Sequence, residues 1–335
     1  MRITKDLLMN FARNTVVERT FRNSDIMCIY LVGSLTREEP LLGGTTDIDL
    51  VFVHMDDPPM AREIVPVVDE VHLDLWHYPI SVFGQPRNLR TNAWIGSFIA
   101  QYALEMYDTQ HFFEYTQSGV SSGFFLPSNM HQRAHSFCRG ARERWMDMQM
   151  QEKSFSSIKL ANYLHALYES GNAIACLSGN PLVERRFLLE LPACAHTLQK
   201  PELYSGLVEL FTKPELPGDQ WQLWLENWDA AYGLLNDRQD SIPQFHHARK
   251  AYYRQAIEVL ASDNPQAALW LLLWTWTQIV EQLPARSAEQ NVWHEFCAQI
   301  DLDRSHFEER LVALDGYLEG VESTLEEYAR QNGVY

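Results

Sequence analysis

The amino-acid sequence predicts an α+β fold in which a small mixed β-sheet domain is followed by a larger all-helical domain. Three stretches before residue 80 have the apolar or alternating pattern of β-strands. From about residue 92 onward, apolar residues recur instead with the 3.6-residue period of helices. The length of 335 residues also exceeds the roughly 250 to 300 residues that one hydrophobic core holds, so we expect two domains.

The first elements expected along the chain are a helix and two strands. Residues 1–21 mix charged and apolar side chains in an amphipathic pattern, and they lack the uninterrupted apolar core of a secretory signal. Residues 26–32 and 48–53 have a β-strand pattern, and the second segment is apolar at nearly every position beyond its aspartates, as a strand buried on both faces is. We expect these two strands to belong to a central sheet.

A third strand and a helical crossover are expected next. Residues 71–78 alternate between apolar and more polar side chains, which is the period-two pattern of a strand with two different faces. Asp74 lies on the more polar face. Between this strand and the previous one, residues 58–70 are expected to form a helical crossover that Pro66 interrupts.

Almost everything after residue 92 is expected to be helical. Apolar residues from Trp94 to Met106 share one face of the first long helix, which would carry Glu105 and Asp108 at its end. Residues 118–127 are rich in Ser and Gly and are the predicted linker, so the predicted domains are residues 1–117 and 128–335. Further helices are expected from residue 128, from 154 to a stop at 179, and over 184–199, 219–235, 243–262, 265–283 and 303–331.

Composition and charge restrict the classes of protein and partner. A hydrophobic content of 46% indicates a globular chain, and its most apolar stretch, residues 267–274, is too short for a membrane span. Five scattered cysteines, an odd number, argue against a disulfide framework and favour the cytoplasm. The net charge of −17 disfavours nucleic acid as the main partner and fits a neutral or cationic acceptor better.

Two aspartates within the second predicted strand are the strongest chemical signal. Asp47 and Asp49 are two residues apart, so on a strand their carboxylates point to the same side while Ile48 packs behind them. Mg²⁺ prefers hard oxygen ligands and typically takes one or two carboxylates, with water and substrate phosphates completing its shell. The pair therefore predicts a divalent cation site that stays open to a nucleotide.

Residues on the neighbouring strands extend this site. Gly33 and Ser34 follow the first predicted strand, where a residue without a Cβ lets a phosphate approach the backbone and a hydroxyl can donate a hydrogen bond. Asp74 joins the same site if its strand neighbours that of Asp47. A third carboxylate would bind a second metal ion or take a proton from an acceptor hydroxyl.

This arrangement resembles the nucleotidyltransferase superfamily that includes DNA polymerase β. The shared pattern is a hydrophobic strand, Gly-Ser, a loop of about a dozen residues, an Asp-x-Asp within a hydrophobic strand, and a later acidic residue on another strand. Within that superfamily the chain looks most like the small-molecule branch, the aminoglycoside adenylyltransferases, in which a helical domain follows the compact nucleotidyltransferase domain. The motif resemblance covers residues 26–78.

The resemblance implies a role for each matching residue. It assigns Gly33 and Ser34 to the triphosphate, Asp47 and Asp49 to metal, and Asp74 to metal or to general-base catalysis. Such enzymes often place a basic side chain from the helical part over the phosphates, for which Lys159 is the candidate and Lys153 the rival. The sequence differs from the family pattern at residues 37–40. Many relatives continue a short helix here, and in this chain Pro40 must end that helix early.

The resemblance also implies a reaction. The chain would transfer a nucleoside monophosphate, by default AMP from ATP, to a hydroxyl of a small acceptor such as an aminoglycoside, releasing pyrophosphate. Two Mg²⁺ ions are the implied cofactors, with the NTP as donor substrate. The alternatives are an AMP-transferring antitoxin that acts on proteins, a signalling-nucleotide synthase, and a nucleotide-binding regulator without turnover. The oligomeric state is left open.

Other patterns have simpler explanations. His131 and His135 stand one helical turn apart, but no third metal ligand accompanies them. The tryptophans at positions 221, 224, 228, 270, 274 and 276 recur at helical spacing and are expected to fill a core.

Overall fold

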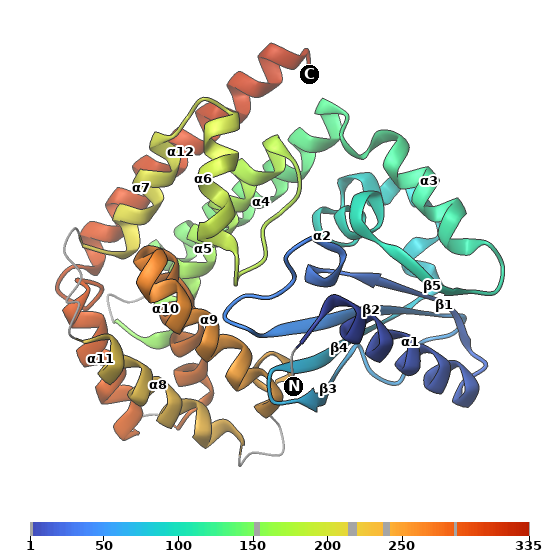
Figure 1. Cartoon of the computed structure of the whole chain (residues 1–335). Helices are drawn as coiled ribbons and strands as arrows, with labels where there is room; N and C mark the ends of the chain where they lie inside the picture. The colour runs from blue at the N-terminus through green and yellow to red at the C-terminus, as the bar shows by residue number, and fades with distance from the viewer. Residues whose placement is uncertain (1–2, 151–154, 214–219, 237–241, 285–286, 335) are drawn as a thin grey trace. The chain divides into compact units, whose positions relative to one another are not determined.

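The computed structural model of the chain describes residues 3–150, 155–213, 220–236, 242–284 and 287–334 (Figure 1). The chain divides into two compact units. We call the first the sheet unit; it comprises Met1–Asn129 together with Ile242–Ala256. The second, the helical unit, comprises Met130–Ser241 and Ile257–Tyr335. The predicted α+β class, a small mixed sheet followed by a larger helical region, is confirmed.

The sheet has five strands in the spatial order β3-β4-β2-β1-β5. Strand β2 pairs antiparallel with β1 and parallel with β4, which makes the sheet mixed. Strands β3 and β5 form the two edges, each antiparallel to its neighbour. The strands are β1 (Ile26–Val32), β2 (Thr46–His54), β3 (Arg62–Val68), β4 (Val71–Pro79) and β5 (Leu104–Asp108). The three predicted strands are thus confirmed as β1, β2 and β4.

The predicted helical crossover between residues 58 and 70 is wrong. The chain forms the edge strand β3 there and returns antiparallel along β4. The run from Ile64 to Val68 contains four β-branched residues, which pack well on a pleated surface. Pro66 is tolerated because an edge strand leaves one side without a ladder hydrogen bond to donate.

The predicted long helix from residue 92 to 106 is also wrong. It stops after α2 (Ala93–Ser97) and one π-helical turn, η4 (Phe98–Tyr102). The chain then forms β5, which covers the free edge of β1. Backbone pairing with β1 outweighs the helical period, and it places Glu105 and Asp108 on a strand.

Residues 118–127, predicted as a linker, are instead mostly helical. They belong largely to α3 (Phe112–Phe124), and the next helix, α4 (Pro127–Met150), begins at their end. Val120 and Phe124 are fully buried, so this segment contributes to a hydrophobic core. Its Ser and Gly residues allow the helix to pack closely against its neighbours. A composition rich in Ser and Gly is therefore compatible with a packed helix as well as with a linker.

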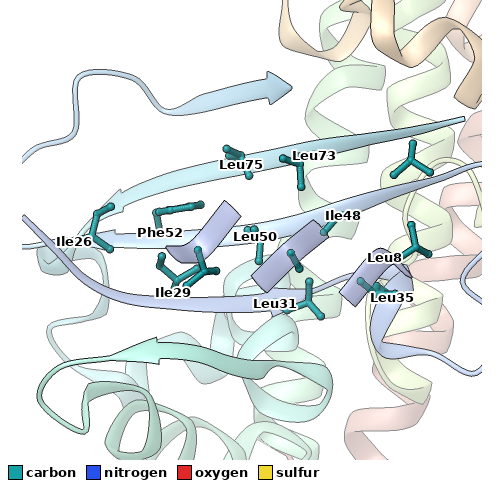
Figure 2. Close-up of a cluster of buried hydrophobic side chains, with 13 residues drawn as sticks. Leu8, Ile26, Ile29, Leu31, Leu35, Ile48, Leu50, Phe52, Leu73 and Leu75 are labelled. Atoms are coloured by element: carbon teal, nitrogen blue, oxygen red, sulfur yellow. The ribbon is translucent and has the colours of Figure 1, made fainter. Parts of the chain in front are cut away.

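Helix α1 (Lys5–Arg22) covers one face of the sheet. Its N-terminus is capped by Thr4, whose hydroxyl accepts a hydrogen bond from the Leu7 N–H. Leu8, Ala12 and Val16 recur at helical spacing and pack on the sheet. Figure 2 shows Leu8 beside Leu31 and Ile48 of the strands. The strands supply Ile26, Ile29, Leu31, Ile48, Leu50, Phe52, Val71, Leu73 and Leu75 to this core.

The opposite face of the sheet has a separate apolar core. It includes Val51 and Val53 of β2, which pack with Phe113, Val120 and Phe124 of α3. Alternation along β2 puts residues 47, 49, 51 and 53 on this same face. The aspartates therefore lie at the start of the strand, and the apolar residues cover its later half.

The helical unit has a tryptophan-rich core, as predicted. Of the six predicted tryptophans, Trp224, Trp228, Trp270, Trp274 and Trp276 are buried and Trp221 is half-buried; Trp293 is buried as well. No helix in the described segments combines the length and apolar character that a membrane crossing requires. The helices that follow α4 are α5 (Ser157–Ser178), α6 (Phe187–Thr197), α7 (Glu202–Phe211), α8 (Trp221–Asn236), α9 (Lys250–Asp263, which starts in the sheet unit), α10 (Pro265–Gln282), α11 (Ala288–Gln299) and α12 (Phe307–Asn332).

A histidine chain at one end of the sheet predicts acid sensitivity. The His54 ring lies 2.9 Å from the Asp25 carboxylate and 2.9 Å from Nδ1 of His77. Burial and the neighbouring His54 ring lower the pKa of His77 from 6.5 to about 4. The unfolded chain therefore binds this proton more readily, and folding stability falls as the pH drops from 6.5 toward 4.

We expect the wild type to lose about 1 to 2 kcal/mol more unfolding free energy than His77→Gln when the pH is lowered from 7.5 to 5. Denaturant titrations at both pH values measure this difference. Equal losses in the two proteins would show that His77 does not carry the acid sensitivity.

Candidate metal centre

Three aspartates converge on the face of the sheet opposite α1. Asp47 and Asp49 are two residues apart on β2, and Asp74 on β4 is in direct register with Asp49. The parallel pairing of β2 with β4 therefore carries all three side chains to one side. One carboxylate oxygen of each lies within 4.8 Å of the others.

The three carboxylates concentrate negative charge in a poorly solvated place. Asp47 and Asp74 are buried, and Asp49 is the most exposed of the three. Burial, and then the charges of Asp47 and Asp74, raise the pKa of Asp49 well above its ordinary value. Nearby arginines oppose this shift but do not cancel it.

These residues fit a divalent cation. Hard carboxylate oxygens are the ligands that Mg²⁺ prefers, and the group offers one from each of three side chains. A bound cation would also offset the unfavourable burial of charge among these carboxylates. In the described residues, no other group of three or more His, Cys, Asp or Glu side chains meets this geometry, so His131 and His135 remain a pair.

Gly33 is required next to this cluster. Its φ of 76° and ψ of −152° are values that a residue with a side chain rarely adopts. A Cβ at this position would lie 1.9 Å from Oδ2 of Asp49. The missing side chain thus lets the Asp49 carboxylate rest against the backbone at the end of β1.

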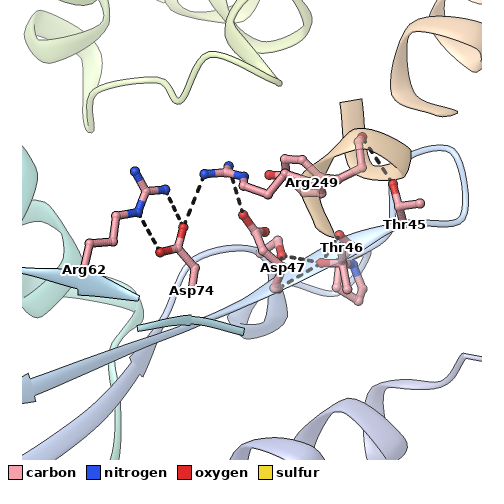
Figure 3. A network of polar contacts seen from close by, with 9 residues as sticks. Thr45, Thr46, Asp47, Arg62, Asp74 and Arg249 are labelled. Carbon is pink, nitrogen blue, oxygen red and sulfur yellow. Dashed lines mark hydrogen bonds and ion pairs between the residues drawn. The ribbon is translucent and has the colours of Figure 1, made fainter. Parts of the chain in front are cut away.

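Ser34 ties the end of β1 to the start of β2. Its hydroxyl lies 2.8 Å from the Thr46 hydroxyl, which in turn is 3.2 Å from the Pro40 carbonyl oxygen (Figure 3 shows the Thr46 contacts). The helix after Gly33 is a single 3₁₀ turn, η1 (Ser34–Thr36), and is short as expected. The assignment of Gly33 and Ser34 to a triphosphate stays a prediction.

Arg62 is a residue of this site that the sequence did not reveal. Its guanidinium donates to both oxygens of Asp74, with Nε 2.8 Å from Oδ1 and Nη2 2.6 Å from Oδ2. It also lies 4.3 Å from the centre of the Trp76 ring. Arg62 belongs to β3, so it was missed along with that strand. The β-branched run that follows it was the available signal.

Arg249 is the second residue that was missed. It ends η6 (His247–Arg249), and its side chain is directed at the aspartates (Figure 3). Its Nη1 lies 3.6 Å from an oxygen of Asp74, and its Nη2 lies 3.9 Å from an oxygen of Asp47. The rings of Tyr252 and Tyr253 lie 5.2 and 5.3 Å from its guanidinium carbon.

The segment carrying Arg249 is seated on the loop that precedes β2. The Thr45 hydroxyl donates to the Tyr252 carbonyl oxygen over 3.4 Å. A Cβ on Gly43, whose φ is 60°, would lie 2.3 Å from the Gln255 carbonyl oxygen. Close backbone contact therefore holds this distant part of the chain beside the aspartates.

Lys159 lies in the helical unit, on α5. It is buried, and its ammonium nitrogen is 5.6 Å from the centre of the Phe307 ring. Its role over the phosphates stays a prediction, because Lys159 and the aspartates belong to different units. The rival Lys153 lies outside the described residues.

The five cysteines form no disulfide.

Comparisons with known proteins add only a distant likeness among solved structures. No protein-family profile matches the sequence, and no curated protein matches it. Among solved structures, the chain is similar to a nucleotidyltransferase-like protein from Exiguobacterium sibiricum, with 12% sequence identity and a TM-score of 0.30. That match covers 96% of this chain and 78% of the other. At this score the likeness carries no weight, and the functional proposal rests on the geometry of the aspartates.

Proposed function

We propose that the chain is a metal-dependent nucleotidyltransferase that moves AMP from ATP to a hydroxyl of a small acceptor and releases pyrophosphate. The observation that carries the proposal is the convergence of Asp47, Asp49 and Asp74 on one side of the sheet, directly beside Gly33. The sequence pattern of Gly-Ser followed by Asp-x-Asp supports a nucleotide rather than a bare cation as the ligand.

Asp47 and Asp49 are proposed to hold Mg²⁺, and Asp49 is the more accessible of the two. Bound metal would supply charge neutralisation at the phosphate oxygens during the transfer of AMP. The surrounding residues then act mainly by positioning. Gly33 leaves room for the Asp49 carboxylate, and the hydrogen bond between the Ser34 and Thr46 hydroxyls ties the end of β1 to the start of β2, the strand that carries Asp49.

Asp74 suits the role of metal ligand better than that of general base. Both of its oxygens accept hydrogen bonds from Arg62. Taking a proton from the acceptor would neutralise the carboxylate and weaken its charge-assisted pair with Arg62, whereas binding a cation leaves the carboxylate charged. A carboxylate oxygen has a second lone pair that remains available to a cation.

The acceptor is proposed to be a neutral or cationic small molecule with a free hydroxyl. The net charge of −17 favours such a partner over a phosphate backbone. An aminoglycoside has this chemistry, since it combines amino groups with several hydroxyls. Transfer to a protein or to a second nucleotide remains the alternative acceptor class.

Incubation with α-labelled ATP and Mg²⁺ tests the proposal against a panel of aminoglycosides and other hydroxylated amines. We expect label on the acceptor and an equal amount of pyrophosphate. The control variant Asp57→Asn should give the same rates as the wild type, because Asp57 is exposed and lies outside the cluster. Label on co-expressed protein or on a second nucleotide would identify the alternative acceptors. ATP binding without any transfer would indicate a regulator and contradict the proposal.

A further inference from the structure

Arg249 is buried, yet part of its hydrogen-bonding capacity is unused. Only 3% of the residue is exposed, and its Nε and Nη1 atoms have no hydrogen-bond acceptor within the protein. Buried donors are normally satisfied, so such atoms point to a ligand that supplies the acceptor. The guanidinium faces Asp47 and Asp74, which places these donors at the proposed metal site.

The distances identify the present role of this guanidinium as a counter-charge. Its contacts of 3.6 and 3.9 Å with the two carboxylates are ion pairs that are too long for hydrogen bonds. The rings of Tyr252 and Tyr253 support it, and the backbone contact at Gly43 fixes its segment. Arg249 is therefore held near the carboxylates without being hydrogen-bonded to them.

We infer that Arg249 makes metal and nucleotide binding cooperative. The inference rests on the proposed function and concerns the regulation of the same site. Without a ligand, Arg249 offsets part of the negative charge of Asp47 and Asp74 and thereby opposes binding of a free divalent cation. When the cation arrives with a nucleotide, the phosphate oxygens supply the acceptors that the Nε and Nη1 donors of Arg249 lack.

The physical basis is a difference in electrostatics between the two ligands. A free divalent cation entering among the aspartates would lie close to a guanidinium of the same sign, in a buried, poorly solvated site where charges interact strongly. A metal–nucleotide complex also brings negative phosphate oxygens, so the repulsion is replaced by charge-assisted hydrogen bonds. By linkage, the nucleotide must then raise the affinity for the metal.

Arg62 does not share this role, because its Nε and Nη2 donors are already engaged by Asp74. It anchors the third carboxylate in a fixed orientation. Arg249 is the arginine whose donors remain available, and this contrast makes it the residue to change.

The test measures Mn²⁺ binding by electron paramagnetic resonance, with and without a non-hydrolysable ATP analogue. We expect Arg249→Met to bind Mn²⁺ alone at least about tenfold more tightly than the wild type does. The analogue should tighten Mn²⁺ binding strongly in the wild type and much less in the variant. Arg13→Met is the matched control, since it removes the same charge from an exposed position on α1 and should behave like the wild type.

A second variant guards against misfolding of the first. Arg249→Lys keeps the charge but loses the planar set of donors, so it should bind free Mn²⁺ as weakly as the wild type while losing most of the nucleotide effect. If the wild type binds Mn²⁺ and both variants bind it equally well, with undiminished nucleotide effects, the inference is overturned and the proposed function stands. If none of the proteins binds Mn²⁺, even with the analogue, both are overturned.

Discussion

Asp49→Asn is expected to lower AMP transfer by about a thousandfold and at the same time to raise the stability of the protein. Loss of one metal-binding carboxylate removes several kcal/mol of charge stabilisation from the transfer step, and each 1.4 kcal/mol is about a factor of ten in rate. Asparagine has the same shape, so the sheet should be undisturbed. A transfer assay at saturating Mg²⁺ measures the first effect.

The stability gain follows from the burial of the Asp49 carboxylate and from its repulsion by Asp47 and Asp74. Because the pKa of Asp49 is raised in the folded protein, its ionisation costs stability at any pH above the unfolded value of 3.8. Asp49→Asn removes this cost. Thermal unfolding at pH 7.5 in the absence of metal should therefore show a higher midpoint temperature for Asp49→Asn than for the wild type. The control Asp57→Asn should leave the midpoint temperature unchanged. A variant that is both inactive and less stable would indicate that Asp49 serves the fold instead.

Gly33→Ala is expected to damage both the fold and the site. The left-handed backbone of Gly33 makes any side chain there costly, by about 1 to 3 kcal/mol. The added methyl group would also collide with the Asp49 carboxylate, since a Cβ would lie 1.9 Å from Oδ2. The carboxylate must then move, so we expect loss of Mn²⁺ binding together with a lower unfolding free energy.

The matched control is Gly316→Ala, in the middle of α12. A Cβ there meets nothing within 4 Å, and alanine favours helix over glycine. Denaturant titration should show this variant to be about 0.5 to 1 kcal/mol more stable than the wild type, with Mn²⁺ binding unchanged. If Gly33→Ala retained wild-type Mn²⁺ affinity, the close packing of Gly33 against Asp49 would have no bearing on the site.

The sequence was informative where one local pattern determines the structure. Strands β1, β2 and β4 have apolar or alternating sequences, and each is hydrogen-bonded to a neighbouring strand on both sides. Their local sequence pattern was therefore enough to predict them. The spacing of Asp47 and Asp49 predicted a shared face, because residues two apart on a strand point to the same side of the sheet. Parallel pairing of β2 with β4, which brings Asp74 to them, was stated only as a condition and is now observed.

The edge strands were not predictable in the same way. The Arg62–Val68 strand carries a proline and the Leu104–Asp108 strand follows a helical pattern, so each is a strand because of the neighbour it pairs with. Local propensity yields to such tertiary pairing. The error at β3 concealed Arg62, which is bound to Asp74.

Arg249 could not have been predicted from spacing at all. It follows Asp74 by 175 positions along the chain, and only the folded structure places its segment in the sheet unit. Nothing in the local sequence distinguishes it from an exposed arginine before a helix. Residues from distant segments that complete a site are found by structure, because no short-range pattern records their contacts.

The central claim, a divalent metal held by Asp47 and Asp49 at a nucleotide site, is tested most directly by anomalous scattering. A crystal is soaked with Mn²⁺ and a non-hydrolysable ATP analogue, and the manganese signal locates the ion. We expect an anomalous peak about 2.1 to 2.2 Å from oxygens of both aspartates, with an analogue phosphate oxygen completing the shell. Bound analogue with no manganese at these aspartates would contradict the claim.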